Sequence, residues 1–71
     1  MAKTRVTNSI RELRSRGDGM TQQDLAERVG VSRQTIVAIE KAKYSPTLEL
    51  AFKIARVLDE PVERVFGYGG G

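Results

Sequence analysis

The chain has 71 residues, which is room for one small domain with a thin core. It contains no cysteine and no histidine, so it offers no disulfide and few of the side chains from which transition-metal sites and nucleophile–base pairs are built. No apolar run approaches the roughly 20 residues of a membrane span, and no signal-peptide core follows Met1. We therefore expect a soluble cytoplasmic domain without a catalytic site, metal, cofactor or small-molecule ligand.

The net charge is +3, and positive charge is concentrated at the N-terminal end. Residues 1–16 contain a single carboxylate, that of Glu12, against the cations Lys3, Arg5, Arg11, Arg14 and Arg16. Such a segment favours a polyanionic partner such as nucleic acid. Simple solubilisation explains it equally well, so for Arg5 and Arg11 both phosphate contact and solvation stay open.

The chain begins with a basic segment, residues 1–6, that we expect to be frayed. A helix is predicted from Thr7 or Asn8, both capable caps, to about Arg16. Gly17-Asp18-Gly19 then indicates a loop, because glycine and aspartate favour turn conformations.

Two short helices separated by one tight turn are predicted next, between Thr21 and Ala42. Thr21 is a good N-cap for the first, and Asp24 stands three residues later, as in a capping box. Gly30 follows at the position where a helix ends with positive φ, a conformation that costs glycine least. The apolar residues of this helix share one face: Leu25, Ala26 and Val29.

The second helix runs from Arg33 to about Lys41, with Ser32 as its cap. Ile36 and Ile39 are its inward positions. Two short helices, the first ending in a glycine and the second opening with a cap, form the pattern of a helix-turn-helix.

The pattern can be matched to a family through these groups of residues: Met20-Thr21-Gln22, Asp24-Leu25-Ala26, Val29-Gly30-Val31-Ser32, Arg33-Gln34-Thr35-Ile36, Ile39-Glu40 and Tyr44-Ser45-Pro46-Thr47-Leu48. With them the chain closely resembles the Cro/C1-type, or Xre-like, helix-turn-helix regulators, specifically their short single-domain members. The resemblance extends over about residues 10–66. It implies an all-α, compact five-helix, lambda-repressor-like DNA-binding domain, placed here at residues 7–66, with the helix-turn-helix at its second and third helices.

The second helix of the motif is the expected recognition helix. At 3.6 residues per turn, its outward face carries Arg33, Gln34, Val37 and Ala38. Arg33 could form two hydrogen bonds with guanine O6 and N7, and Gln34 could do the same at adenine N6 and N7. Val37 and Ala38 could touch a thymine methyl group or simply allow close approach. We expect these four residues to read bases in the major groove.

Six further residues around the motif are expected to bind DNA phosphates: Gln22, Ser32, Thr35, Lys41, Lys43 and Tyr44. Gln22 begins the first helix of the motif, where free N–H groups and the helix dipole favour an anion, and the resemblance implies phosphate contact there. Other roles stay open for the rest. Ser32 could serve only as a cap, the lysines could face solvent, and Tyr44 could pack against the next helix.

The resemblance also implies an ion pair between Arg14 and Glu40, at least partly buried. Such a pair is weak evidence for net stability, but removing one partner from it is costly. Glu40 has no second carboxylate or base near it in the pattern, so no catalytic role is expected.

A fourth helix is predicted over residues 48–58, opened by Pro46-Thr47. Its inward stripe is expected to comprise Leu48, Ala51, Phe52, Ala55 and Leu58, widened by Ile54 and Val57.

Asp59-Glu60 stands where relatives commonly have Gly-Val, so the end of the fourth helix lacks its usual glycine. A short fifth helix is predicted to start at Pro61, and residues 67–71 to form a flexible glycine-rich tail. The resemblance implies dimerisation through the last helices. The candidate dimer contacts are Val62, Val65 and Phe66, although Phe66 could equally close the core of one subunit.

The leading hypothesis is a sequence-specific double-stranded DNA-binding transcriptional regulator, specifically a repressor, acting as a homodimer on a pseudo-palindromic operator. A protein-interaction module, such as the antitoxin of a toxin–antitoxin pair, is the alternative. An enzyme is the least favoured class, and the few aromatic residues argue against stacking on single-stranded RNA.

Overall fold

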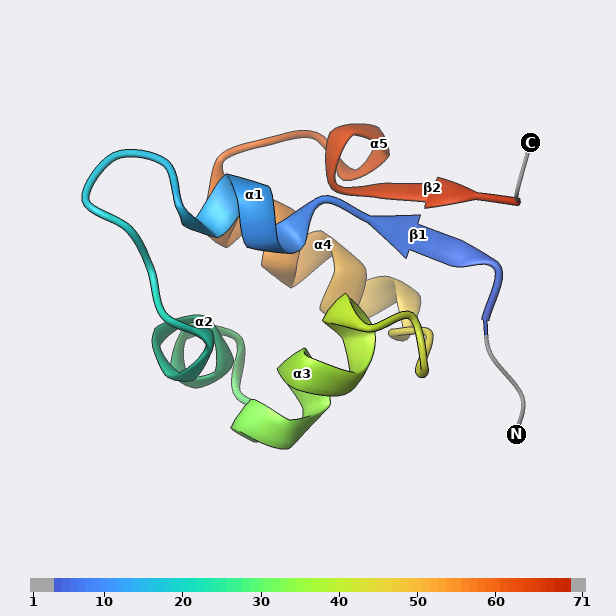
Figure 1. Ribbon diagram of the computed structural model, residues 1–71, viewed down its shortest axis with the longest axis horizontal. Coiled ribbons are helices and arrows are strands. Elements are labelled where there is room, and N and C mark those ends of the chain that lie inside the picture. The colour runs from blue at the N-terminus through green and yellow to red at the C-terminus, as the bar shows by residue number, and fades with distance from the viewer. Residues whose placement is uncertain (1–3, 70–71) are drawn as a thin grey trace.

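The computed structural model describes residues 4–69. Five helices and two short strands follow one another in the order β1 (Val6–Asn8), α1 (Ile10–Arg14), α2 (Gln22–Val29), α3 (Arg33–Glu40), α4 (Leu48–Leu58), α5 (Val62–Val65) and β2 (Phe66–Tyr68). In Figure 1, α2 and α3 lie at the bottom of the molecule, whereas α5 and the strands lie at the top. α4 passes behind α1 and α3 and connects the two regions.

The core is a single cluster to which every helix contributes. Its fully buried large side chains are Ile10, Leu25, Ile36, Ile39, Ile54 and Val65. Ala26 is also completely buried, where a small residue lets α2 approach its neighbours closely. The predicted all-α architecture with five helices and a helix-turn-helix at α2 and α3 is confirmed.

The helix-turn-helix follows from local chemistry. The hydroxyl of Thr21 accepts a hydrogen bond from the N–H of Asp24 at 2.9 Å, and the Asp24 carboxylate accepts one from the N–H of Thr21 at 3.1 Å, which completes the capping box. Gly30 ends α2 with a φ of 80°, as predicted from its position. Ser32 caps α3 by accepting from the N–H of Thr35 at 3.2 Å.

The two ends of the described chain form a sheet that the sequence analysis did not predict. β1 and β2 pair antiparallel, with Val6 opposite Tyr68 and Asn8 opposite Phe66. The helix expected from Thr7 or Asn8 to Arg16 is therefore wrong at both ends, since α1 covers only Ile10–Arg14. The N–H of Ser9 donates to the carbonyl of Val65 at 2.9 Å. The backbone just before α1 therefore bonds to the C-terminal segment and does not form a helical turn.

This sheet also changes the expected limits of the domain. The sequence predicts a frayed segment at Val6 and a flexible tail at Gly67 and Tyr68, but all three residues are paired in the ladder. The N–H of Gly69 donates to the carbonyl of Arg5 at 2.9 Å and extends the pairing by one step. The expectations for residues 1–3 and 70–71 lie outside the described residues.

The inward stripe predicted for α4 is partly wrong. Leu48 is 70% exposed and Phe52 is 53% exposed, although their spacing predicts that both lie in the core. The buried residues of α4 are Leu50, Ala51, Ile54, Ala55 and Leu58. Leu50 faces the core instead, because it lies on the same side of α4 as Ile54 and Leu58, whereas Leu48 and Phe52 lie on the adjacent side.

Two helix ends adopt the left-handed conformation without glycine. Ala42, after α3, has a φ of 58°, and Asp59, which ends α4, has a φ of 59°. The guanidinium of Arg16 supports the second end by donating to the carbonyl of Leu58 at 3.3 Å and to the carboxylate of Glu60 at 2.8 Å. No helix within residues 4–69 is long and apolar enough to cross a membrane.

Candidate nucleic-acid interface

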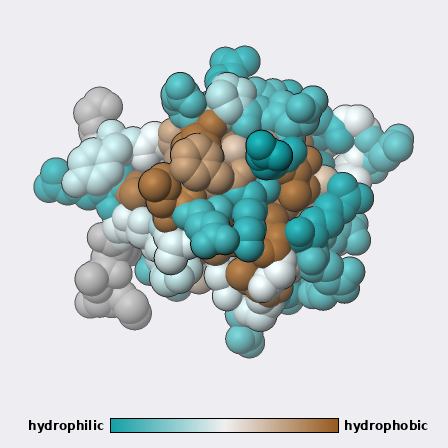
Figure 2. Space-filling view, turned by 180° about the vertical axis from the view of Figure 1, so that it is seen from behind, coloured by the Kyte–Doolittle hydropathy of each residue, from teal (hydrophilic) through white to brown (hydrophobic). Residues whose placement is uncertain are grey.

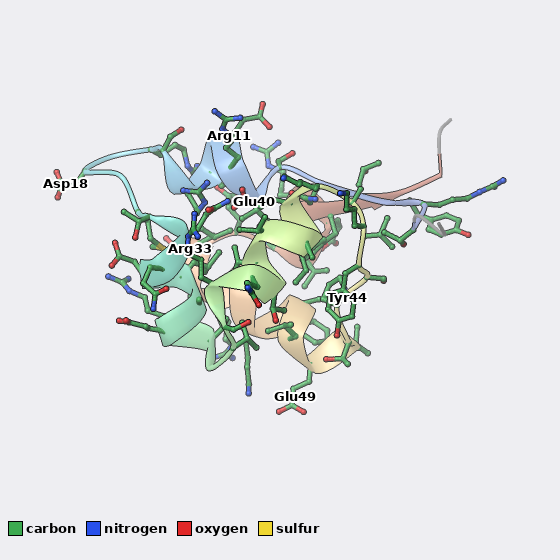
Figure 3. All side chains as sticks on the ribbon, turned by 60° about the horizontal axis from the view of Figure 1, so that its bottom comes forward. Arg11, Asp18, Arg33, Glu40, Tyr44 and Glu49 are labelled. Atoms are coloured by element: carbon green, nitrogen blue, oxygen red, sulfur yellow. The ribbon has the colours of Figure 1, made fainter. Side chains whose placement is uncertain are left out.

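α3 presents the side chains predicted to read bases on its outer face. Arg33 and Gln34, in its first turn, are exposed, whereas Val37 and Ala38 are partly buried. Figure 3 looks onto α3, with Arg33 and Arg11 on one side of it and Tyr44 on the other. The two long polar side chains are therefore free to reach a ligand, and the two small apolar ones allow that ligand to come close to the helix.

A polar network fixes the C-terminal half of α3 behind this face. The Glu40 carboxylate accepts hydrogen bonds from Arg14 Nε at 2.7 Å and Nη2 at 3.2 Å, and from the Gln22 amide at 3.1 Å. The side chains of Arg14 and Glu40 are only 13% and 8% exposed. The ion pair expected between these two residues is thus present, and it joins α1 and the start of α2 to α3.

Gln22 has a second role that the sequence analysis did not predict. Its amide nitrogen donates to Glu40, so the side chain is held against the recognition helix. One amide proton and the free N–H groups at the start of α2 stay available for an anion. Gln22, which is expected to bind a phosphate, is therefore hydrogen-bonded to the helix that is expected to read bases.

A shallow hollow of about 370 Å³ lies beside this network. Its walls are formed by Arg11, Arg14, Gln22, Val37, Glu40 and Lys41. Arg11 and Lys41 are both exposed at its edges, and Arg14 already neutralises Glu40 within it. The hollow is therefore a cationic cleft between α1 and α3, of a kind suited to a phosphate.

The hydroxyls around the turn are already engaged with each other. Ser32 caps α3, and its Oγ lies 3.1 Å from Oγ1 of Thr35. At the other end of α3, Lys41, Lys43 and Tyr44 are exposed, and Tyr44 retains 46% of its accessible surface. Phosphate contacts at these five positions stay predictions.

Asn8 is a supporting residue that sequence reasoning missed. Its amide nitrogen donates to the carbonyl of Ile39 at 2.8 Å, while its side-chain oxygen accepts from the N–H of Ile10 at 3.2 Å. It therefore connects the terminal sheet and the start of α1 to the last turn of α3. The sequence marks Asn8 as a cap, but gives no signal for a partner 31 residues away.

Two carboxylates outside this face have pKa values lowered by local hydrogen bonds. The backbone N–H of Thr21, followed by its hydroxyl, lowers the pKa of Asp24. The hydrogen bond from Arg16 lowers the pKa of Glu60. Arg16 is thereby tied to the end of α4 and is not part of the candidate interface.

The candidate dimer contacts are distributed differently from the prediction. Val65 is 1% exposed and completes the core of one subunit, so it cannot contact a second copy in this conformation. Val62 and Phe66 pack against the same core and stay partly exposed. α5 packs against α4, and Val65 is the residue of this four-residue helix that is buried in the core cluster.

Comparison with known proteins identifies the family to which this architecture belongs. The helix-turn-helix family profile matches residues 10–65. An HTH-type transcriptional regulator of Archaeoglobus fulgidus is 56% identical over 57 residues, which cover 80% of each chain. The phage CTXphi transcriptional repressor RstR of Vibrio cholerae is 36% identical over 56 residues, which cover 79% of this chain and 50% of RstR.

Among solved structures, the restriction-modification controller protein C.AhdI of Aeromonas hydrophila superposes with a TM-score of 0.70 at 29% identity, over 78% of both chains. The chain belongs to the helix-turn-helix family of Cro/C1-type, Xre-like transcriptional regulators. That class is DNA-binding and not enzymatic.

Proposed function

We propose that the protein is a repressor that binds a pseudo-palindromic operator as a homodimer and reads each half-site with α3. The observation that carries this proposal is the pair Arg33 and Gln34, exposed in the first turn of a helix whose far end is anchored by the ion pair between Arg14 and Glu40. A fixed helix with free side chains suits base reading, because the side chains then sample few positions relative to the DNA.

In this proposal, phosphate contacts set the register and base contacts give the specificity. Gln22, Arg11 and Lys41 surround the cationic hollow and would hold one phosphate group, while Lys43 and Tyr44 would hold another beyond the end of α3. Arg33 and Gln34 would form bidentate contacts with purines in the major groove. Ser32 and Thr35 would contribute hydroxyl contacts at the turn, and Val37 and Ala38 would face the base methyl groups.

The geometry of the major groove supports the proposed homodimer. One α3 covers only part of one turn of the major groove, so two copies related by a two-fold axis would read half-sites about 34 Å apart. Repression would result from occupying the operator, and RstR is a relative named as a repressor. The protein would carry out this function on DNA in the cytoplasm.

The test is selection of bound duplexes from a random pool by the wild type and by Arg33→Ala and Gln34→Ala. Arg64→Ala is the matched control, because Arg64 is exposed on α5, on the opposite side of the molecule from α3 (Figure 1). The proposal predicts an enriched palindrome for the wild type and the control, and relaxed preference at defined positions for the two α3 variants. Enrichment of no sequence, with only salt-sensitive binding that no variant alters, would refute it.

A further inference from the structure

α4 has an apolar side that no part of the described chain covers. Leu48 and Phe52 lie one helical turn apart on it and are 70% and 53% exposed. Beside them a hollow of about 320 Å³ opens between α4 and the start of α5, with Phe52, Ala55, Pro61 and Val62 among its walls. Seen from behind, where α4 comes to the front, the molecule shows brown apolar surface bordered by teal polar groups (Figure 2).

The charges beside this apolar side have a distinctive order. Glu49 and Arg56 are seven residues apart, so they lie along the same edge of the helix, one toward each end. Glu49 has only a loose intrahelical partner, Lys53, at 3.5 Å, and its side chain is 81% exposed. The edge thus carries a negative charge at its N-terminal end, whereas the positive charges of Lys53 and Arg56 lie toward its middle and its C-terminal end.

We infer that this side of α4 docks a second copy of the chain, with the two α4 helices antiparallel about a two-fold axis near Phe52. In that arrangement Glu49 of each copy faces Arg56 of the other, which forms two symmetry-related ion pairs. A parallel arrangement would place like charges together. Leu48 and Phe52 would fill the centre of the contact, and the hollow beside Phe52 would receive an apolar side chain of the second copy.

The self-complementary charge order is the reason for choosing a second copy over an unrelated partner. An isologous contact requires that one surface patch match itself, and the antiparallel order of Glu49 and Arg56 meets that condition. The contact also leaves α3 free, since Arg33 and Glu49 project from separate parts of the molecule (Figure 3). The inference rests on the homodimer of the proposed function. It assigns the dimer contact to the exposed side of α4 instead of to Val65.

The test is the dimer dissociation constant from sedimentation equilibrium, measured for the wild type, Phe52→Glu and Tyr68→Glu. Tyr68 is the matched control, an aromatic residue that is 78% exposed on β2. We expect Phe52→Glu to weaken dimerisation at least tenfold, because it places a carboxylate at the centre of an apolar contact, and Tyr68→Glu to leave it unchanged. Circular dichroism establishes that each variant is folded.

A charge exchange tests the orientation independently of folding. Glu49→Lys and Arg56→Glu should each weaken the dimer about fivefold or more, and the double variant should regain most of the loss. No rescue in the double variant, an unchanged dimer in Phe52→Glu, or a loss caused by Tyr68→Glu would overturn the inference. A wild type that stays monomeric at millimolar concentration would also overturn it.

Binding of Phe52→Glu to one half-site separates this inference from the proposed function. A monomeric variant that still prefers the half-site sequence shows that base reading is intact and that only the dimer is lost. A wild type that dimerises through α4 but selects no sequence would instead refute the proposed function and leave the α4 contact standing.

Discussion

The helix-turn-helix and the terminal sheet are specified in different ways. The signals for α2 and α3, two capping side chains and Gly30, all lie within residues 21–35 and act on backbone a few residues away. The sheet instead pairs Val6–Asn8 with Phe66–Tyr68, from opposite ends of the chain. The helix-turn-helix is therefore built from local interactions, whereas its attachment to the rest of the domain is built from interactions between distant parts of the chain.

Two contacts from the N-terminal part of the chain attach the last turn of α3 to the rest of the domain. Glu40 is held by Arg14 of α1, and the carbonyl of Ile39 is held by Asn8 of β1. The recognition helix is therefore positioned by the N-terminal segment, even though its own formation depends on Ser32 and its immediate neighbours.

The largest effect is expected at the buried attachment. Glu40→Ala would leave the charge of Arg14, which is 13% exposed, without its partner, and should lower the free energy of unfolding by about 3 kcal/mol. Urea denaturation at fixed protein concentration measures this change. Lys53→Ala, which breaks an exposed pair, should cost less than about 0.5 kcal/mol, and equal effects of the two substitutions would contradict the assignment.

The strands of the terminal sheet approach so closely at Gly67 that a larger residue there should destabilise the fold. A Cβ added at Gly67 would lie 2.8 Å from Oγ1 of Thr7 across the ladder. Gly67→Ala should therefore destabilise the fold by about 1 kcal/mol, and most of this loss should disappear in a Thr7→Ala background. A double-mutant cycle by denaturation measures the coupling, and additive effects would show that the two residues do not meet.

The turn after α3 should gain stability from a residue suited to positive φ. Ala42 has a φ of 58°, so Ala42→Gly should raise the free energy of unfolding by about 0.5–1 kcal/mol. Ala51→Gly, inside α4, should have the opposite sign, because glycine is unfavourable in a helix interior. Thermal melts of the two variants test this, and destabilisation by both would rule out strain at Ala42.

The smallest effect concerns pH. The folded-state pKa values of Asp24 and Glu60 are lowered, so both carboxylates favour the folded state at pH values above their unfolded pKa, near 4. This contribution is lost as the pH falls through the lower folded-state values. Asp24→Asn should therefore flatten the fall in melting temperature between about pH 5 and pH 2, and a steeper fall would contradict the assigned direction.

The sequence predicts the helix-turn-helix better than the terminal sheet, and the reason is physical. Thr21, Gly30 and Ser32 act locally, so the helix-turn-helix was predicted nearly to the residue, and the ion pair between Arg14 and Glu40 followed from the resemblance. Val6–Asn8 forms a strand only because Phe66–Tyr68 lies beside it, and no local pattern encodes that pairing.

The same limit applies to burial on α4 and to Asn8. Leu48 and Phe52 have the spacing of a core stripe, but Leu50, Ile54 and Leu58 have such a spacing too, and only the packing of the other helices decides which stripe is buried. Asn8 and the second role of Gln22 depend on partners on α3 that helical periodicity cannot identify. Base and phosphate contacts stay predictions for every residue of the interface.

Base reading by Arg33 can be tested by combining a change in the protein with a change in the DNA. Once selection has supplied an operator, its contacted guanine is replaced by 7-deazaguanine, which lacks the N7 acceptor. Affinities are then measured for the wild type and Arg33→Ala. We expect the modified base to weaken wild-type binding by about 1 kcal/mol or more and to have no further effect on Arg33→Ala. Equal losses for both proteins, at every guanine of the half-site, would show that Arg33 does not read the sequence.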